Sequence, residues 1–296
     1  MPVKIKCFGG KIGWAAQKIF PKQSSAIITK LNFARKRKNA LDYIEAFQNE
    51  PTQPQQIAIE TVNRCNNICG FCPCNINDEN RPFKKMPEDL FQNIVSQLIS
   101  WKYNGRILMN INNEPFIDTR FNDMVKYLRG KMPENYIFVI TNGTLLTLEK
   151  FIDIAPHMNR IHINNYANTM KLHENASQIY KHVSDNPVLF NHLDLTIQLR
   201  YLGEVISNRN GNAPNKPISK SVINEPCIEP YYSMCIYPDG VVGLCCTDVL
   251  EKTNLGNCGA SKLSDIWHSH EFVKIRELMQ KSRSGYGHCK YCDVYT

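Results

Sequence analysis

Three cysteines in one short segment have the spacing of a metal-cluster ligand set. The segment "ETVNRCNNICGFCPC" (60 to 74) holds Cys65, Cys69 and Cys72 as CxxxCxxC and directly follows the β-like run "QIAIET" (56 to 61). In parallel βα folds, ligands and catalytic groups gather in such loops. Three thiolates can bind three irons of a four-iron cluster and leave the fourth open to a ligand. The alternative is a zinc site that Cys74 closes.

A second set of cysteines lies in the last third of the sequence. Cys227 is followed after twelve residues by Gly240, and after four more by Cys245; Cys289 and Cys292 then form "CKYC". Four thiolates around a hairpin and a distant CxxC pair could enclose one four-iron cluster completely, and zinc is again the alternative. An all-cysteine cluster cannot easily bind substrate through iron. Its expected roles are electron acceptor, electron relay or scaffold.

The first motif resembles that of the radical S-adenosylmethionine (SAM) enzymes, which usually have an aromatic residue, here Phe71, before the third cysteine. The resemblance implies a [4Fe-4S] cluster on Cys65, Cys69 and Cys72 that binds SAM. Reduction of that cluster would give a 5'-deoxyadenosyl radical that takes hydrogen from an unactivated carbon. A flavodoxin- or ferredoxin-type protein is the implied electron donor.

The second set resembles the cysteine pattern of the SPASM and twitch subdomains of this family. The longer SPASM type holds two clusters and has an additional CxxCxxxxxC run, which this sequence does not contain. The resemblance therefore implies a twitch subdomain with one auxiliary [4Fe-4S] cluster. Its implied ligands are Cys227, Cys245, Cys289 and Cys292.

Further positions resemble SAM-binding features of the family. In "NINNEP", Asn112 and Asn113 stand where the family often has glycines, and Glu114 keeps the acidic residue that meets the SAM amino group. "TNG" (141 to 143) resembles a common turn of the family. For "TNG" the alternative is a simple helix-entry turn, and for Asn164 and Arg200 it is an ordinary polar residue at a strand end. The implied SAM contacts are Phe71, Asn113, Glu114, Thr141, Asn142, Asn164 (ribose) and Arg200 (carboxylate).

Two residues are predicted to act on the substrate. The spacing is similar to that of aminocyclitol-oxidising and aminoglycoside-epimerising members of the family from antibiotic biosynthesis, which implies hydrogen abstraction from a carbinol carbon of a sugar or aminocyclitol. Loss of a proton and an electron would then give a ketone, whereas hydrogen return from a thiol would give an epimer. Cys246 is the predicted thiol donor, and in a continuing strand it would face away from Cys245. Arg209 is the predicted substrate contact. Cys74, Cys235 and Cys258 compete for the donor role.

Other functions stay open at this point. A radical SAM enzyme could instead modify a peptide or protein. The net charge of +8 is concentrated in residues 1 to 40, which hold ten Lys and Arg, including the run from Arg35 to Lys38, and no acidic residue. This basic arm could contact an anionic carrier or a membrane surface. For the enzyme we expect no nucleic acid partner; a zinc-bearing module that binds nucleic acid is the alternative from another class.

The pattern around these motifs predicts an α/β protein. β-like runs at 106 to 112, 136 to 142, 160 to 165 and 193 to 202 follow the first, and a helix with Leu90, Phe91, Ile94, Val95, Leu98 and Ile99 on one face follows Pro87. Repeated βα units indicate a parallel sheet, either a barrel or an open sheet. The resemblance implies a partial (β/α)6 TIM-like barrel, with five clear strands, and a C-terminal twitch subdomain of a β-hairpin at "YPDGVVG" and a helix over 264 to 280.

Length and composition complete the prediction. The chain has 296 residues, 43% of them hydrophobic, and no apolar run reaches the roughly 18 residues of a membrane span. Twelve cysteines without a secretory signal indicate metal chemistry rather than disulfides, so a cytoplasmic enzyme is expected. The predicted domains are a basic extension (1 to 50), the radical SAM barrel (51 to 205) and the auxiliary-cluster domain (206 to 296).

Overall fold

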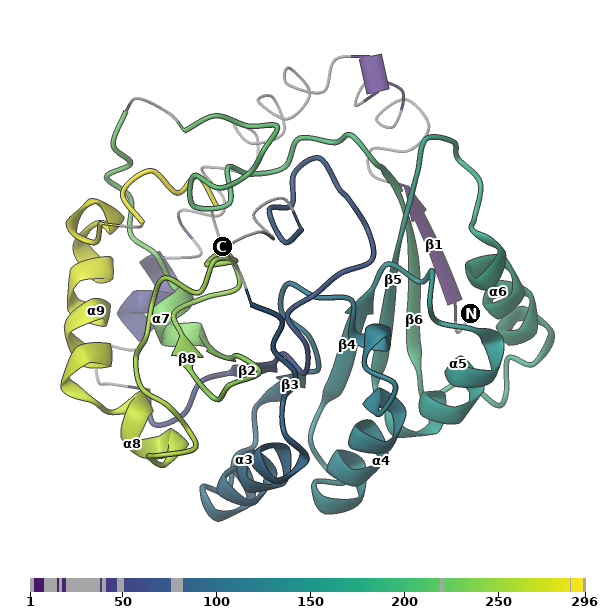
Figure 1. The fold of residues 1–296 in the computed structure, drawn as a ribbon, viewed down its shortest axis with the longest axis horizontal. Coiled ribbons are helices and arrows are strands. Elements are labelled where there is room, and N and C mark those ends of the chain that lie inside the picture. The colour runs from purple at the N-terminus through teal and green to yellow at the C-terminus, as the bar shows by residue number, and fades with distance from the viewer. Residues whose placement is uncertain are drawn as a thin grey trace.

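One eight-stranded sheet organises the whole chain (Figure 1). The computed structural model describes residues 3–7, 15, 18–19, 38, 41–46, 51–75, 82–218, 221–287 and 289–294. Along the sheet the strand order is β1-β6-β5-β4-β3-β2-β7-β8, and every neighbouring pair is parallel except β7 with β8. The strands are β1 (Val3–Cys7), β2 (Gln56–Ile59), β3 (Arg106–Leu108), β4 (Ile137–Thr141), β5 (Arg160–Ala167), β6 (Asp194–Tyr201), β7 (Ser233–Ile236) and β8 (Val242–Gly243).

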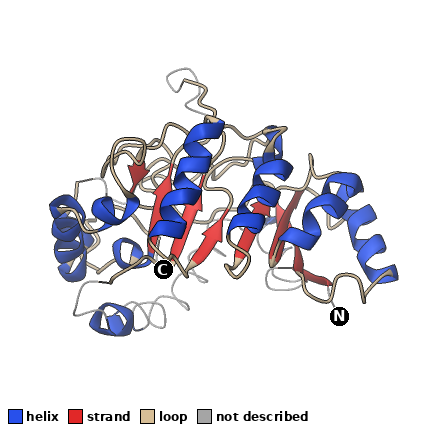
Figure 2. Cartoon of the chain, turned by 90° about the horizontal axis from the view of Figure 1, so that it is seen from below, coloured by secondary structure: helices blue, strands red, loops and turns tan. Residues whose placement is uncertain are grey.

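Helices cover one face of the parallel strands. One long helix follows each of the strands β2 to β5, and in the two views these four helices lie along the same outer side of the sheet (Figures 1 and 2). They are α3 (Glu88–Ser100), α4 (Phe121–Lys131), α5 (Leu148–Ile154) and α6 (Glu174–Asp185). Further helices pack near β7 and β8: α7 (Glu229–Tyr232), α8 (Leu263–Trp267), α9 (His270–Lys281) and the 3-10 turn η4 (Arg283–Gly285). Two short 3-10 helices, η2 (Pro115–Ile117) and η3 (Ala155–His157), lie in the connections after β3 and β4.

The strand residues alternate between two apolar layers. On the outer face, residues such as Ile57, Ile107 and Val139 join the helices in the main core. On the inner face, the strand pairing places four residues side by side, and these form a smaller cluster. We call this cluster the inner floor: Ala58, Leu108, Phe138 and Cys235. The polar residues of the predicted site follow it toward the carboxyl ends of the strands.

Two strands join regions that the sequence separates. Val3–Cys7, within the predicted basic extension, pairs with β6 as a sixth parallel strand of the barrel beyond the five predicted ones. Ser233–Ile236 pairs with β2, so that the hairpin of the predicted auxiliary domain continues the barrel sheet. Of the basic run, Lys38 is exposed, and Arg35 to Arg37 lie outside the described residues.

The structure corrects three local predictions. The helix expected over 264 to 280 is two helices, because Ser269 starts a new one: its Oγ accepts a hydrogen bond from Phe272 N at 3.3 Å. Ile99 of α3 is 45% exposed, whereas Phe91 on the same helix is buried. β8 ends at Gly243, so strand alternation does not extend to the two adjacent cysteines. No helix among the described residues is long and apolar enough to cross a membrane.

Candidate active site and metal centres

The first three cysteines line a pocket at the carboxyl ends of the parallel strands. The pocket has about 550 Å³ of empty space, part of it open to solvent. Segments after β2, β3 and β4 supply most of its wall, and β5 adds two side chains. The predicted residues around it are Cys65, Cys69, Cys72, Phe71, Asn113, Glu114, Thr141, Asn142, Asn164 and Arg209. The sequence did not single out Asn67, Asn110, Ile111, Asn112, Ile140 and Tyr166, which also line it.

Glu114 links two of these strand ends. It is 1% exposed; its Oε1 accepts from Thr141 Oγ1 at 2.7 Å and its Oε2 from the Asn142 backbone at 2.8 Å. Burial raises the pKa of Glu114 to about 7, against the partial effect of these hydrogen bonds. Each carboxylate oxygen can accept more than one hydrogen bond, so Glu114 can also receive an ammonium group from the pocket.

Two buried amide groups in the pocket wall have unused donors. Asn112 and Asn113 are 9% and 8% exposed, and the side-chain Nδ2 of each has no hydrogen-bond partner in the structure. Their oxygens are occupied: Asn112 Oδ1 accepts from Arg209 and Asn113 Oδ1 from the Ile111 backbone. A buried donor without a partner costs about 1–3 kcal/mol. The pocket therefore fits a ligand rich in oxygen acceptors, as SAM is.

The cysteine thiols of this pocket lie in surroundings that disfavour free thiolates. Burial raises the pKa of Cys65 to about 11 and that of Cys69 to about 12. Metal ligands must be deprotonated, so binding of a cation here would release protons. Asn142 Nδ2 lies 3.8 Å from Cys65 Sγ and can donate a hydrogen bond to the sulfur. Cys74, the alternative zinc ligand, is buried and is not among the side chains that line the pocket.

Arg200 lies behind the pocket wall. It is not among the lining residues; its guanidinium pairs with Glu204 at 2.6 Å and stands 5.3 Å from the ring centroid of Tyr166. Its charge also acts on Cys69, whose pKa it lowers against the larger effect of burial. Arg200 thus contacts Tyr166 and acts electrostatically on Cys69, and its contact with the SAM carboxylate stays a prediction.

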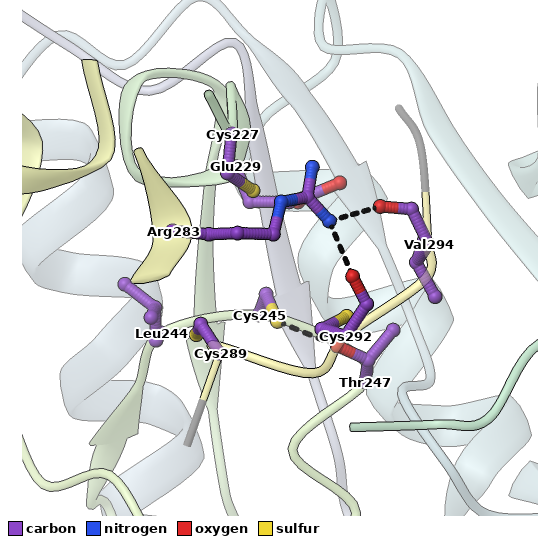
Figure 3. Close-up of a pocket in the computed structure, with 9 residues that line it drawn as sticks. All are labelled: Cys227, Glu229, Leu244, Cys245, Thr247, Arg283, Cys289, Cys292 and Val294. Atoms are coloured by element: carbon purple, nitrogen blue, oxygen red, sulfur yellow. Dashed lines mark hydrogen bonds between the residues drawn. The ribbon is translucent and has the colours of Figure 1, made fainter. Parts of the chain in front are cut away.

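The second set of cysteines surrounds a cavity of its own (Figure 3). Cys227, Cys245, Cys289 and Cys292 line it together with the side chains of Glu229, Leu244, Thr247, Arg283 and Val294. Cys227 precedes α7 and Cys245 follows β8, while the last two belong to the segment after η4. Burial raises the pKa of Cys227 to about 11 and also raises that of Cys245. The structure thus brings together four thiols from three separate segments.

The spacing of these thiols bears on which metal group they could hold. Four thiolates on one tetrahedral zinc ion would lie about 3.8 Å from one another. Across the part of the chain that the structure describes, no three Cys, His, Asp or Glu side chains are close enough to share one ion. The four cysteines do line one cavity, and an all-thiolate set is a known ligand set for iron–sulfur clusters as well as for zinc.

Cys246 differs from the other free cysteines. Its side chain is exposed, whereas Cys74, Cys235 and Cys258 are at most 2% exposed, and Cys235 and Cys258 belong to apolar clusters. Burial by the surrounding protein nevertheless raises the pKa of the Cys246 thiol to about 12. The charge of Arg209 lowers the same pKa, so Arg209 lies near Cys246.

Arg209 is held between the two cysteine sites. Its Nη1 donates to Asn112 Oδ1 at 3.3 Å, and its guanidinium lies 5.7 Å from the Phe71 ring centroid. The backbone of Arg209 has a φ of 48°, which non-glycine residues rarely adopt. The preceding Asn208 anchors this turn: its backbone N donates to Asp293 Oδ1 at 2.7 Å, next to Cys292.

Comparison with known proteins identifies the two sites. Residues 59–165 match the radical SAM superfamily, and residues 227–293 match SPASM, an iron–sulfur cluster-binding domain. The chain is a radical SAM enzyme. The radical SAM domain implies SAM and a four-iron cluster, and the SPASM domain implies auxiliary iron–sulfur binding. These matches confirm the predicted family and cofactors, and they favour iron–sulfur clusters over zinc at both cysteine sets.

The relatives of this radical SAM enzyme also support the fold. The S-adenosyl-L-methionine-dependent 2-deoxy-scyllo-inosamine dehydrogenase of Niallia circulans is 26% identical over 238 residues, which is 80% of this chain and 92% of the relative. The crystal structure of BtrN with AdoMet and 2-DOIA is 23% identical, with a TM-score of 0.68 over 82% of this chain and 94% of that one. AnSMEcpe with bound AdoMet is 12% identical, with a TM-score of 0.53 over 80% and 88%. The predicted α/β fold class is confirmed.

Proposed function

We propose that this enzyme oxidises a carbinol carbon of a sugar or aminocyclitol to a ketone, with one auxiliary [4Fe-4S] cluster on Cys227, Cys245, Cys289 and Cys292 as the electron acceptor. The observation that carries the proposal is the position of Arg209. Its side chain lines the pocket of the first cluster, and its turn is bonded through Asn208 to the segment of Cys292. A substrate held by Arg209 would lie between the radical source and the acceptor.

The reaction balances with these two sites. SAM bound at the first site would supply a 5'-deoxyadenosyl radical that takes the hydrogen atom of the carbinol C–H bond and becomes 5'-deoxyadenosine. The substrate would then lose its hydroxyl proton to solvent and one electron to the auxiliary cluster, and a C=O bond would form. In this proposal Asn112 and Arg209 donate hydrogen bonds to substrate oxygens, and Glu114 and Asn113 bind SAM; all four residues line the pocket. The 26% identical relative is named for the oxidation of an aminocyclitol, which supports this substrate class.

An anaerobic assay with reconstituted enzyme, SAM and dithionite tests the proposal. The first probe is 2-deoxy-scyllo-inosamine, the compound in the relative's name, followed by a panel of related aminocyclitols and sugars. The expected result is a ketone and 5'-deoxyadenosine in equal amounts, with Arg209→Gln lowering the ketone yield. Ketone at far less than one equivalent for every substrate, with 5'-deoxyadenosine still formed, would contradict oxidation.

Epimerisation is the second candidate reaction, and the exposure of Cys246 favours it. The Cys246 side chain is exposed and lies near Arg209, while the competing Cys74, Cys235 and Cys258 are buried. In deuterium oxide, a thiol donor would place one deuterium at the epimerised carbon. Cys246→Ala separates the two reactions: oxidation should proceed within about twofold of the original rate, whereas epimerisation should stop. Cys258→Ala, at a buried position, is the control.

A further inference from the structure

Arg283 has an unusual place in the auxiliary site. It begins the 3-10 turn after α9, is 2% exposed, and lines the same cavity as the four cysteines (Figure 3). Arginine is rarely buried so completely unless its donors are paired. The contacts of this side chain therefore show what its burial accomplishes.

The guanidinium of Arg283 bonds to the two chain segments that hold the outermost cysteine ligands. Nε donates to Glu225 O at 3.2 Å and Nη2 to Pro226 O at 2.9 Å, just before Cys227. On the other side, Nη1 donates to Cys292 O at 2.9 Å and also to Val294 O. Figure 3 shows the latter two bonds as dashed lines. One planar group thus joins segments that lie more than sixty residues apart in sequence.

We propose that Arg283 is a positioning residue of the auxiliary site, which holds the Cys227 and Cys292 segments at cluster-binding distance and whose charge favours the reduced state of the bound cluster. The first part follows from the fork of donors, because arginine fixes several acceptors in one plane. The second follows from charge: a cation beside the thiolates stabilises the extra negative charge of a reduced cluster. Glu229 lines the same cavity and opposes this effect.

Lysine and methionine substitutions separate the two parts. Arg283→Lys keeps the charge and loses the fork; we expect it to lose up to half of the bound iron and to leave the midpoint potential of the remaining auxiliary cluster nearly unchanged. Arg283→Met removes both, so the iron loss should be at least as large and the midpoint potential of any retained auxiliary cluster should shift to more negative values. Iron and sulfide counts, and redox titration followed by electron paramagnetic resonance, measure these effects.

Arg276 is a matched control. It is also 2% exposed and donates to backbone carbonyls of Pro230 and Trp267, but it does not line the cavity. Arg276→Lys and Arg276→Met should lower thermal stability without selective loss of auxiliary iron. Equal iron loss in the Arg276 and Arg283 variants would show a general packing role and overturn the proposal. Full iron and an unchanged potential in Arg283→Met would overturn it as well.

The inference rests on the proposed auxiliary cluster, and the wild-type protein distinguishes the two failures. About eight irons per reconstituted chain are expected for two four-iron clusters. About four irons in the wild type would refute the auxiliary cluster itself. About eight irons in the wild type and in both Arg283 variants, with equal potentials, would refute only the role of Arg283. None of these readouts requires the substrate.

Discussion

The two cysteine sites are built in opposite ways. In the first, one loop after β2 carries all three ligands, and the pocket beside them is open and lined with amides. In the second, the four predicted ligands come from three segments, and a buried arginine lines the cavity in place of an open polar wall. An incomplete ligand set on a local loop leaves room for SAM. A complete set from distant segments excludes a ligand and depends on the tertiary fold for its assembly.

This difference predicts which of the two sites loses its ligand geometry when the surrounding structure is disturbed. A local loop keeps its spacing even when distant packing is disturbed, whereas the second site loses its ligands whenever one of its three segments moves. The first site should therefore tolerate changes in the second, but the substrate reaction should need both. The following five experiments test how the two sites depend on each other and on their surroundings, beginning with the largest expected effect.

Removing one ligand of the first site should abolish all chemistry. In Cys72→Ala the three-cysteine set is broken, so SAM cleavage should fall below detection, measured as 5'-deoxyadenosine formed with dithionite. Cys258→Ala is the control, because Cys258 is 1% exposed and packs in the main core. A Cys72→Ala protein that still cleaves SAM would contradict the assignment of Cys65, Cys69 and Cys72 as the ligands of the SAM-binding cluster.

Removing two ligands of the second site should divide the activities. In the double variant Cys289→Ala, Cys292→Ala we expect the iron content to fall from about eight to about four per chain. SAM cleavage should persist, because the first site keeps its ligands, while ketone formation should stop. Loss of both clusters would show that the first site depends on the second.

Glu114→Gln should weaken SAM binding roughly tenfold, since hydrogen bonds to charged groups contribute about 1.5–3 kcal/mol. Burial raises the pKa of Glu114 to about 7, so its ionised form, which binds an ammonium group, increases as the pH rises through neutrality. Wild-type affinity for SAM should therefore increase from about pH 6 to about pH 8, and the variant should lack this dependence. Equilibrium dialysis with radiolabelled SAM measures both.

The same raised pKa predicts a stability effect of opposite sign. The folded chain holds the Glu114 proton more tightly than the unfolded chain, whose pKa is near 4.5. The resulting contribution of Glu114 to the free energy of unfolding is complete below about pH 4.5 and is lost as the pH rises through about 7. Without SAM, urea unfolding of the wild type relative to Glu114→Gln should show the wild type losing stability over this interval. An unchanged difference would mean that Glu114 stays ionised.

The smallest effect is expected at an ion pair between the two regions. Lys84 Nζ lies 2.6 Å from both Asp239 and Glu251, and so connects the segment after the first cysteine loop to the hairpin. Lys84→Met should lower the free energy of unfolding by about 1 kcal/mol and the ketone yield per SAM cleaved. The control Lys126→Met removes a 2.6 Å pair with Asp153 on the barrel helices and should leave that yield unchanged. Equal ketone yields per SAM cleaved in the Lys84 and Lys126 variants would contradict a role for Lys84 in coupling SAM cleavage to ketone formation.

Sequence patterns revealed the features whose signals are short in range. CxxxCxxC spacing predicted the first ligand set, and the alternating βα pattern predicted the five strands from β2 to β6. For the second set, whose members are scattered, spacing alone left an iron–sulfur cluster and zinc open, and the resemblance was needed to choose between them. β1 was missed because five residues with alternating lysines read as part of a basic arm, and their pairing partner, β6, lies almost 190 residues later.

Residues that act through distant partners left no signal. Arg283 and Asn208 read as ordinary polar residues, and their acceptors lie 57 and 83 residues away in sequence. Asn112 could have been found, because it stands beside the implied SAM contacts in "NINNEP". Its pairing with Arg209, 97 residues later, could not. The assignments of individual site residues remain predictions that the experiments above address.

The pairing of β7 with β2 has a consequence for electron transfer. Ala58 is paired with Cys235 and Ile59 with Ile236; Cys65 lies in the loop after β2, and Cys245 follows β8, which pairs with β7. Backbone hydrogen bonds of one sheet therefore join the strands that precede the two cysteine sets. The rate of electron tunnelling falls steeply with distance. If both proposed clusters are present, the pairing of these strands would hold the tunnelling rate between them steady while substrates enter and leave.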